Sequence, residues 1–333
     1  MFELILLDIG FIPGIELLGT TVYHYTAYIA VVLALIYLIV RYQTSSLVKT
    51  RKLLDEKDRA YQEITRQRQE LENKNRNITD SLIYASYMQQ ALLPSEKYFK
   101  SIIPDSFIFY KPKDIVSGDF YWLTKKKSKI FIVAADCTGH GVPGAFMSMI
   151  GVELLNKIIL DQGIQQPSEI LKILGRGLER TFNTTREVKS LLKTGMDMGL
   201  CAIDEKKGEM QYSGAFLPLY IIRDNKLTEI KGEKLTIGLM GELSFKNHRM
   251  KIHEGDIIYL FTDGYADQFG GPNDKKFMYR RFRHLLLTIH KFPLKEQKMI
   301  INESMDTWKM GADQVDDMLV IGVKPSLKKS LNR

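Results

Sequence analysis

The feature that most constrains this chain is an apolar run near its N-terminus, residues 21–40 (TVYHYTAYIAVVLALIYLIV), which contains no formally charged residue. At about 1.5 Å per residue, a helix of roughly 20 apolar residues matches a hydrocarbon core about 30 Å thick. The sequence therefore predicts a transmembrane helix over 21–40. A buried core helix is the alternative, while a cleaved signal peptide fits less well, because no basic residue precedes the run.

Charged residues on the two sides of this run predict its orientation. The residues before it carry only acids, whereas residues 41–54 carry only bases, namely Arg41, Lys49, Arg51 and Lys52. The positive-inside rule then places residues 1–20 outside the cytoplasm, as a short extracytoplasmic N-terminus, and everything after Arg41 inside. This predicts a single-pass protein of the cytoplasmic (inner) membrane. Residues 1–20 are too few for a folded sensor, so a signal would come through a partner, the span or the linker.

Residues 41–92 predict a helical linker, because they are polar and contain neither glycine nor proline. Apolar positions repeat there at heptad spacing, which is typical of a parallel coiled coil and hence of a homodimer. One seam consists of Leu47, Leu54, Tyr61, Arg68, Asn75 and Leu82, and the other of Ile64, Leu71, Ile78, Ala85 and Leu92. A single solvated helix is the alternative. Pro94 marks the end of the helix, since the residue before a proline disfavours it.

Residues 93–333 predict an α+β domain. Short apolar segments such as SFIFYKP, KIFIVAAD and KIHEGDIIYLFTDG are strand-like, and two helical patterns, AFMSMIGVELLNKIIL and SEILKILGRGLERTF, lie between the two groups of strands. Further helical patterns precede a final strand, DDMLVIGVK. Strands in two groups with helices between and after them indicate a sandwich of sheets and helices.

Several aspartates stand at the ends of these apolar segments. Asp136 follows IFIVAA, Asp263 follows IIYLFT, and the pair Asp316 and Asp317 precedes MLVIGV. One such aspartate alone would be an ordinary turn or cap residue. Several carboxylates beside buried strands are costly unless a cation neutralises them. Together with the SGD sequence at Asp119, the pattern predicts a site for hard Mg²⁺ or Mn²⁺ ions.

Seven segments carry a resemblance to a known family. They are SLIYASYMQQALLPS, FYKPKDIVSGDFYW, ADCTGHGVPGAFMS, GMDMGLCAID, YSGA, FTDGYADQFGG and QVDDMLVIGV, in this order, over about residues 80–325. In sequence and order they resemble the metal-dependent protein phosphatases (the PPM superfamily), in the bacterial branch of sporulation and stress-response serine phosphatases that act on sigma-factor regulators. The resemblance implies an α-β-β-α sandwich over residues 93–333.

The resemblance also implies two divalent cations, Mn²⁺ or Mg²⁺, joined by a water or hydroxide that attacks the phosphate directly. Asp136 matches the bridging ligand and the backbone carbonyl of Cys137 the adjoining one. Asp263 and Asp316 match carboxylates of the first metal. Asp119 matches the acid near the second metal, either as a ligand or through a water molecule.

The resemblance also bears on residues around the metal ligands. His140 matches the proton donor to the leaving seryl oxygen, with a structural histidine in a glycine turn as the alternative. Asp197 and Asp317 are expected just behind the ligands. Of the two neighbouring aspartates, Asp316 is the preferred ligand. Cys137 is expected to be a packed thiol and not a nucleophile, because no CxxxxxR loop follows it. Eukaryotic relatives hold phosphate with an arginine that has no counterpart here, so the substrate-binding residues stay unassigned. Substrate binding is then expected to depend on docking of the partner protein.

These observations predict a membrane-tethered protein serine/threonine phosphatase. Its substrate would be a phosphorylated cytoplasmic regulatory protein, such as an anti-sigma-factor antagonist. In the related branch, helices before the sheet act as a switch for metal binding, and residues 81–95 match that place. A catalytically silent signalling adaptor is the alternative, and no motif supports a nucleotide cyclase. The net charge of +8 is spread among acids along the chain, without a nucleic-acid-binding signature, so nucleic acid is not an expected partner.

Overall fold

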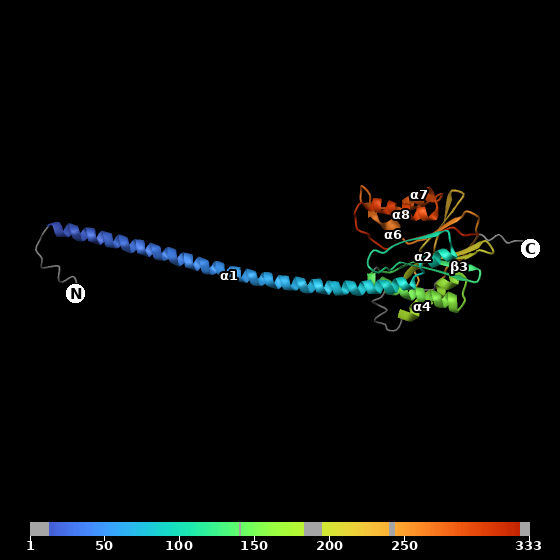
Figure 1. The fold of residues 1–333 in the computed structure, drawn as a ribbon, viewed down its shortest axis with the longest axis horizontal. Helices are drawn as coiled ribbons and strands as arrows, with labels where there is room; N and C mark the ends of the chain where they lie inside the picture. The colour runs from blue at the N-terminus through green and yellow to red at the C-terminus, as the bar shows by residue number, and fades with distance from the viewer. Residues whose placement is uncertain (1–12, 140, 183–194, 240–243, 327–333) are drawn as a thin grey trace, which may run out of the picture. The chain divides into compact units, whose positions relative to one another are not determined.

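The computed structural model describes residues 13–139, 141–182, 195–239 and 244–326, with side chains from residue 22 onward. The chain forms two compact units, Met1–Asn77 and Ile78–Arg333. One continuous helix, α1 (Pro13–Leu92), contributes to both units. The segments predicted to be a membrane helix and a linker are therefore parts of a single helix, as Figure 1 shows.

The end of α1 lies where the sequence predicts it, two residues before Pro94. A short helix follows, α2 (Glu96–Ile102), whose first turn is capped by the Ser95 hydroxyl oxygen, which accepts a hydrogen bond from the Tyr98 N–H. Ser95 is a favourable capping residue because its oxygen satisfies a backbone donor that has no partner within the helix.

The second unit is built on two five-stranded antiparallel sheets. The first has the order β1-β12-β9-β6-β7 and contains β1 (Ser106–Lys111), β12 (Met318–Val323), β9 (Ile257–Phe261), β6 (Leu219–Arg223) and β7 (Lys226–Ile230). The second has the order β2-β3-β4-β5-β8 and contains β2 (Phe120–Lys126), β3 (Lys129–Cys137), β4 (Met196–Asp204), β5 (Glu209–Ala215) and β8 (His248–Lys251). A small hairpin joins β10 (Phe269–Gly270) to β11 (Lys275–Lys276).

Helices cover the outer face of each sheet. The second sheet is covered by α3 (Gly141–Leu155), the π-helical turn η1 (Asn156–Asp161) and α4 (Pro167–Phe182). The first sheet is covered by α7 (Met278–Ile289) and α8 (Leu294–Lys309), next to the short helix α6 (Gly264–Asp267). Figure 1 shows α7 and α8 on one side of the sheets and α4 on the other. The predicted α-β-β-α sandwich is confirmed.

Strand alternation explains why both faces of each sheet are buried. Along β3, Ile130 and Ile132 pack between the two sheets, while Phe131 and Val133 pack against the helices outside. This period of two puts successive side chains on opposite faces. Because helices cover the outer faces, both sets of side chains are apolar, and β3 reads as a continuous apolar run rather than an alternating one.

Candidate active site

The candidate site residues meet because the strands that carry them end at the same place. Asp136 lies in β3 directly opposite Asp197 in β4. Asp119 immediately precedes β2, whose first residue pairs with Ala135 in β3. In the other sheet, Asp263 follows β9 and Asp316 precedes β12, and Phe261 at the end of β9 pairs with Val320 near the start of β12.

The carboxylates interact strongly with one another. Burial, followed by the charges of Asp263, Asp316 and Asp197, raises the pKa of Asp136 to about 8. Burial and the charge of Asp316 raise the pKa of Asp263 to about 6. Burial, followed by the charge of Asp136, raises the pKa of Asp119 well above its usual range. The sequence-predicted aspartates thus form one cluster in which charge is poorly compensated.

Asp119 and Asp136 are neighbours in this cluster, because after burial the charge of Asp136 is the largest cause of the raised pKa of Asp119. Neighbouring like charges in a buried site disfavour each other's ionisation unless a cation is present. Within the described part of the chain, no lysine, arginine or histidine forms a recorded ion pair with Asp119, Asp136, Asp197 or Asp263. Among the described residues, the cluster therefore has no cationic side chain in an ion pair that would compensate these four aspartates.

Thr262 fixes the orientation of Asp119. Its hydroxyl donates a 2.6 Å hydrogen bond to Asp119 Oδ2 and accepts one of 3.1 Å from the Leu319 N–H. The Tyr110 hydroxyl donates to the backbone carbonyl of Asp119 at 3.0 Å. Asp119 is almost completely buried, so these contacts hold its side chain and backbone in one position. Sequence reasoning missed Thr262 and Tyr110, since nothing in their local pattern marks them.

Asp317 organises the loop that carries Asp119. Its Oδ1 accepts a 2.7 Å hydrogen bond from the Lys113 N–H, and its Oδ2 accepts one of 2.7 Å from the Gly118 N–H. Both oxygens of the buried Asp317 carboxylate are therefore engaged with backbone donors, while its own N–H donates to Asp316 Oδ1 at 2.9 Å. This geometry distinguishes the two neighbouring aspartates, because Asp317 faces the loop.

Gly118 allows two loops to come together. A side-chain Cβ at this position would lie 2.8 Å from the Gly139 carbonyl oxygen and 3.1 Å from the Cys137 carbonyl oxygen. Any larger residue would push the loop before β2 away from the loop after β3. The close approach brings the Cys137 carbonyl beside the SGD segment, where the sequence predicts a ligand oxygen.

The last turns of α1 also reach the site loops. The Gln89 side chain is buried, and its Nε2 donates to the Ser117 carbonyl oxygen at 2.6 Å and to Ser148 Oγ at 2.8 Å. Its Oε1 accepts a 3.1 Å hydrogen bond from the Ser117 N–H. Gln89 therefore joins α1, the loop that ends in Asp119, and α3. Sequence reasoning missed it, because its partners Ser117 and Ser148 lie far away in the chain.

Two sequence predictions concern the loop after β3. Burial, followed by the charge of Asp136, raises the pKa of the Cys137 thiol well above its ordinary value, so it remains protonated, which agrees with the expected packed thiol. Cys201 is also a buried free thiol. His140 lies outside the described residues, and its predicted role as a proton donor stays a prediction.

The donor set fits hard divalent cations. All the side-chain donors are carboxylate oxygens, and Mg²⁺ typically uses one or two of these per ion together with several waters. Among the described residues, no group of three or more His, Cys, Asp or Glu side chains forms a ready-made ligand shell. The clustered carboxylates therefore fit ions that keep much of their hydration, rather than one ion fully enclosed by protein.

Comparisons with known proteins identify this arrangement. The PP2C domain of SiaA from Pseudomonas aeruginosa superposes with a TM-score of 0.69 at 31% identity, covering 75% of this chain and 98% of that domain. The PP2C phosphatase domain of SpoIIE from Bacillus subtilis, with a fragment of its regulatory domain, gives a TM-score of 0.52 at 21% identity, covering 66% of this chain and 62% of that one. The folded domain is thus of the PP2C phosphatase class.

The sequence defines the family further. The family model of stage II sporulation protein E (SpoIIE) matches residues 126–325. The phosphoserine phosphatase RsbU of Bacillus subtilis is 27% identical over 212 residues, which are 62% of this chain and 58% of RsbU. The chain belongs to the SpoIIE family. The match spans less than two thirds of the length of RsbU.

The Asp317 contacts predict a specific effect on the loop. Asp317→Ala removes the acceptors of the buried Gly118 N–H and the partly buried Lys113 N–H, and a loss of this kind costs about 1–3 kcal/mol for a buried donor. We expect a lower free energy of unfolding and faster hydrogen exchange at Lys113 and Gly118, with a smaller effect in Asp317→Asn, which keeps one acceptor oxygen. Unchanged exchange at both amides in Asp317→Ala would contradict this role.

The raised carboxyl pKa values predict an inverted pH dependence in the metal-free protein. Above about pH 4 the unfolded carboxyls release protons, while the folded protein retains them up to the raised pKa values of about 6 for Asp263 and about 8 for Asp136. The free energy of unfolding in excess chelator should therefore fall from pH 5 to pH 8. Urea denaturation at several pH values measures this.

Asp136→Asn should flatten that fall and stabilise the chelated protein at pH 8, because it removes one of the repelling charges. Asp161→Asn, at an exposed position on η1, is the matched control and should leave the pH dependence as in the wild type. A chelated wild type that gains stability between pH 5 and pH 8 would show that the cluster is not strained by its own charge.

Proposed function

We propose that this chain is a metal-dependent protein serine/threonine phosphatase that hydrolyses phosphoserine or phosphothreonine on a cytoplasmic regulatory protein. The observation that carries the proposal is the cluster of buried aspartates at the strand ends of a PP2C fold. Buried like charges destabilise a protein unless they serve a cation. A silent adaptor would gain nothing from keeping them, so the cluster favours the enzyme.

Each aspartate has a proposed part in holding the ions. Asp136 would bridge the two cations, and the backbone carbonyl of Cys137 would be the neighbouring ligand. Asp263 and Asp316 would hold the first ion and Asp119 the second. Asp197 would stay behind the ligands, since its Oδ1 already accepts a 2.9 Å hydrogen bond from the Thr236 hydroxyl. Asp317 would likewise act behind them, by holding the loop.

Two bound cations, Mn²⁺ or Mg²⁺, would supply an activated water and neutralise the phosphate oxygens. The side chains would set the geometry of that reaction. Thr262 would keep the Asp119 carboxylate aimed into the cluster through its hydroxyl. His140 would donate the proton to the leaving seryl or threonyl oxygen, a role suited to an imidazole titrating near neutral pH.

The substrate would be a phosphorylated regulatory protein of the anti-sigma-factor antagonist kind. The support comes from the SpoIIE family membership and from the phosphoserine phosphatase RsbU, which shares 27% identity with this chain. The SpoIIE match covers the folded domain only, at residues 126–325. The helix α1 lies outside this match and is available to carry a regulatory input.

We propose that α1 carries this input and tethers the enzyme to the inner membrane. Near its start α1 contains a window that is long and apolar enough to cross a membrane, and none of that window is buried. The other helix that passes the same test, Gly141–Asp161, is half buried in the domain and is a core helix. Residues 21–40 would span the bilayer with residues 1–20 outside and the phosphatase domain, residues 93–333, in the cytoplasm.

The exposed seam of α1 supports a homodimer through residues 41–92. Ile64 is 62%, Leu71 59% and Ile78 58% exposed in the single chain, although all three are apolar. A parallel coiled coil would bury them. Nearer the domain, Leu82 and Ala85 are already half-buried within the second unit, so the pairing of two copies would be strongest before residue 82.

Gln89 would couple the helix to the site. Its hydrogen bonds to Ser117 and Ser148 tie the end of α1 to the loop before Asp119 and to α3. A rotation or shift of α1 would break these bonds and release the loop. The switch expected from residues 81–95 would then act on the position of Asp119.

Replacing metal-site aspartates tests the activity. Asp136→Asn and Asp263→Asn are each expected to lower Mn²⁺-dependent hydrolysis of p-nitrophenyl phosphate at least about 100-fold, because each removes a charged ligand. Asp161→Asn, an exposed acid on η1, is the control and should retain wild-type turnover. If the wild type shows no metal-dependent turnover with this compound or with a phosphoserine peptide, the adaptor alternative stands.

Replacing Gln89 tests the coupling. Gln89→Ala removes three hydrogen bonds worth about 1 kcal/mol each, and we expect about half of this free energy to act on the loop, which lowers Mn²⁺ affinity and turnover about 10-fold. Gln90→Ala alters the exposed neighbour and should have no effect. Equal activity in the two variants would show that Gln89 does not couple α1 to the site. Isothermal titration with Mn²⁺ gives the affinity and a steady-state assay gives the turnover.

Removing residues 1–45 tests the tether. The full chain should sediment with membranes and resist alkaline carbonate, and its phosphatase domain should be protected from protease added outside intact spheroplasts. The shortened chain should be released from the membrane fraction. A domain digested from outside would reverse the proposed orientation, and a shortened chain that still resists carbonate would place the anchor elsewhere.

A further inference from the structure

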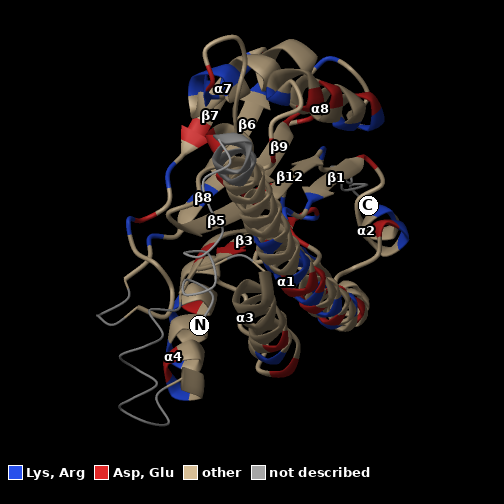
Figure 2. Ribbon diagram, turned by 90° about the vertical axis from the view of Figure 1, so that its left-hand side faces the viewer, with Lys and Arg blue, Asp and Glu red and all other residues tan. Residues whose placement is uncertain are grey.

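A strongly basic segment lies beside the candidate site. Residues 275–295 contain no aspartate or glutamate and include Lys275, Lys276, Arg280, Arg281, Arg283, His284, His290, Lys291 and Lys295. Most of this segment is β11 and α7, and Figure 2 shows α7 in blue. We call its part nearest the site the α7 basic surface, and it consists of Lys275, Lys276, Arg280, Arg281 and His284.

The charges of this surface are mostly unpaired. Among the described residues, Lys276 pairs with Asp267 at 2.8 Å, whereas the side chains of Lys275, Arg280 and His284 form no ion pair or hydrogen bond, and all three residues are exposed. The Arg281 guanidinium lies over the Trp308 ring, 4.7 Å from its centroid. Its Nη1 also donates to backbone carbonyls at the start of α7. The surface therefore presents free cations to solvent.

The position of these cations disfavours a purely structural role. Arg280 and Arg281 lie in the first turn of α7, which contains no acidic residue. The N-terminal end of a helix carries partial positive charge, so acids stabilise it and bases destabilise it. A chain under selection for stability alone would place acids here. The opposite choice indicates that the cations serve an interaction.

Backbone and side-chain contacts hold the surface at the rim of the site. Lys276 contacts Asp267, whose N–H donates to the Asp263 carbonyl oxygen at 2.9 Å within α6. The Phe277 N–H donates to the Gln268 carbonyl oxygen at 2.9 Å. The α7 basic surface thus starts one short helix away from a proposed metal-binding carboxylate.

A pocket of about 680 Å³ opens between α7 and α8 in this surface. Arg280, Arg281 and His284 line it together with the hydroxyl-bearing Thr288 and Ser304, and Phe277 and Leu285 supply apolar walls. Guanidinium and hydroxyl groups over an apolar wall suit an aspartate or glutamate side chain, because they offer charge-assisted donors and cover its methylene groups.

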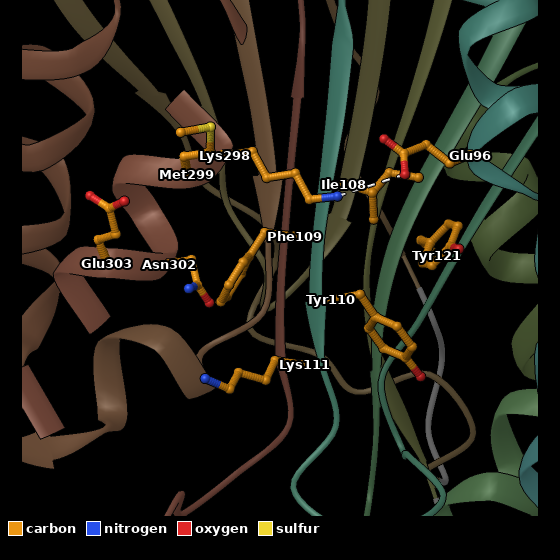
Figure 3. Close-up of a pocket in the computed structure, with 10 residues that line it drawn as sticks. All are labelled: Glu96, Ile108, Phe109, Tyr110, Lys111, Tyr121, Lys298, Met299, Asn302 and Glu303. Carbon is orange, nitrogen blue, oxygen red and sulfur yellow. Dashed lines mark ion pairs between the residues drawn. The ribbon is translucent and has the colours of Figure 1, made fainter. Parts of the chain in front are cut away.

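A second pocket, beside β1, fits this role less well. Figure 3 shows this groove beside β1, where Lys298 pairs with Glu96 at 3.8 Å. Its other lysine, Lys111, pairs with Asp306 at 2.8 Å. Both cations are therefore already neutralised, in contrast to Arg280 and Lys275.

We propose that the α7 basic surface binds an acidic segment of the protein substrate that lies next to its phosphoserine. The inference rests on the proposed phosphatase function and adds the chemistry of substrate recognition. Contacts with residues beside the phosphoserine would also compensate for the lack of a phosphate-holding arginine, because they would hold the substrate. The position at the rim of the site favours a substrate over an anionic lipid surface, because a substrate must reach that rim.

Two phosphoserine peptides that differ only in their flanking residues test the proposal. One has aspartates on both sides of the phosphoserine and the other has alanines. The wild-type full chain should hydrolyse the aspartate peptide with a kcat/KM about tenfold higher, and this preference should shrink as NaCl is raised. Fluorescence anisotropy of the labelled peptides gives their affinities, so binding is read even where turnover is absent.

The double variant Lys275→Glu, Arg280→Glu should abolish the preference, in both kcat/KM and affinity. Its thermal midpoint should equal or exceed that of the wild type, because a glutamate in the first turn of α7 suits the helix end. The control Lys206→Glu makes the same charge reversal at an exposed position in the β4–β5 turn, at the other end of β4 from Asp197. It should keep the full preference.

Two outcomes would overturn the proposal: a wild type that does not distinguish the peptides, or a double variant that still prefers the aspartate peptide. If the double variant instead loses only its binding to phosphatidylglycerol vesicles, the surface serves a membrane. Failure of the phosphatase function looks different, since then the wild type hydrolyses neither peptide nor p-nitrophenyl phosphate while anisotropy still reports whether the acidic peptide binds.

Discussion

The repulsion among buried carboxylates is the constraint on which the rest of this structure depends. Burial together with the neighbouring aspartates lifts the pKa of Asp136 to about 8 and raises that of Asp119 well above its usual range. A fold that holds such a cluster must fix each member firmly, since otherwise the charges would move apart into solvent. The hydrogen bonds from Thr262 to Asp119 and from two backbone amides to Asp317 provide that restraint.

The sandwich makes the cluster possible because two sheets end at one edge. Asp136 and Asp197 are neighbours across β3 and β4, and Asp263 and Asp316 meet where β9 and β12 pair. The helices bury the outer faces of the sheets, and the sheets bury each other's inner faces, so water is excluded from the base of the cluster. The same edge receives Gln89 from α1 and adjoins the α7 basic surface. Control, chemistry and substrate contact are thus proposed to converge there.

The central strands and the site aspartates could be predicted from the sequence, because their hydrophobic pattern is strong. The apolar runs before Asp136 and Asp263 are buried on both faces, so the strands and the aspartates at their ends were evident. The strands β7 (KLTEI) and β8 (HRMK) were missed, because these edge strands are short, polar and only partly buried. The contacts of Gln89 and Thr262 were also missed, since they depend on tertiary partners far away in the chain.

The central claim is that this cluster exists to hold two divalent cations. Crystals of the protein soaked in Mn²⁺ and measured near the manganese absorption edge test it most directly. The account predicts two anomalous peaks about 3.5–4 Å apart, with Asp136 between them, Asp263 and Asp316 at one, Asp119 at the other, and Asp317 touching neither. No peak in the cluster, or a peak held by Asp317 in place of Asp316, would contradict it.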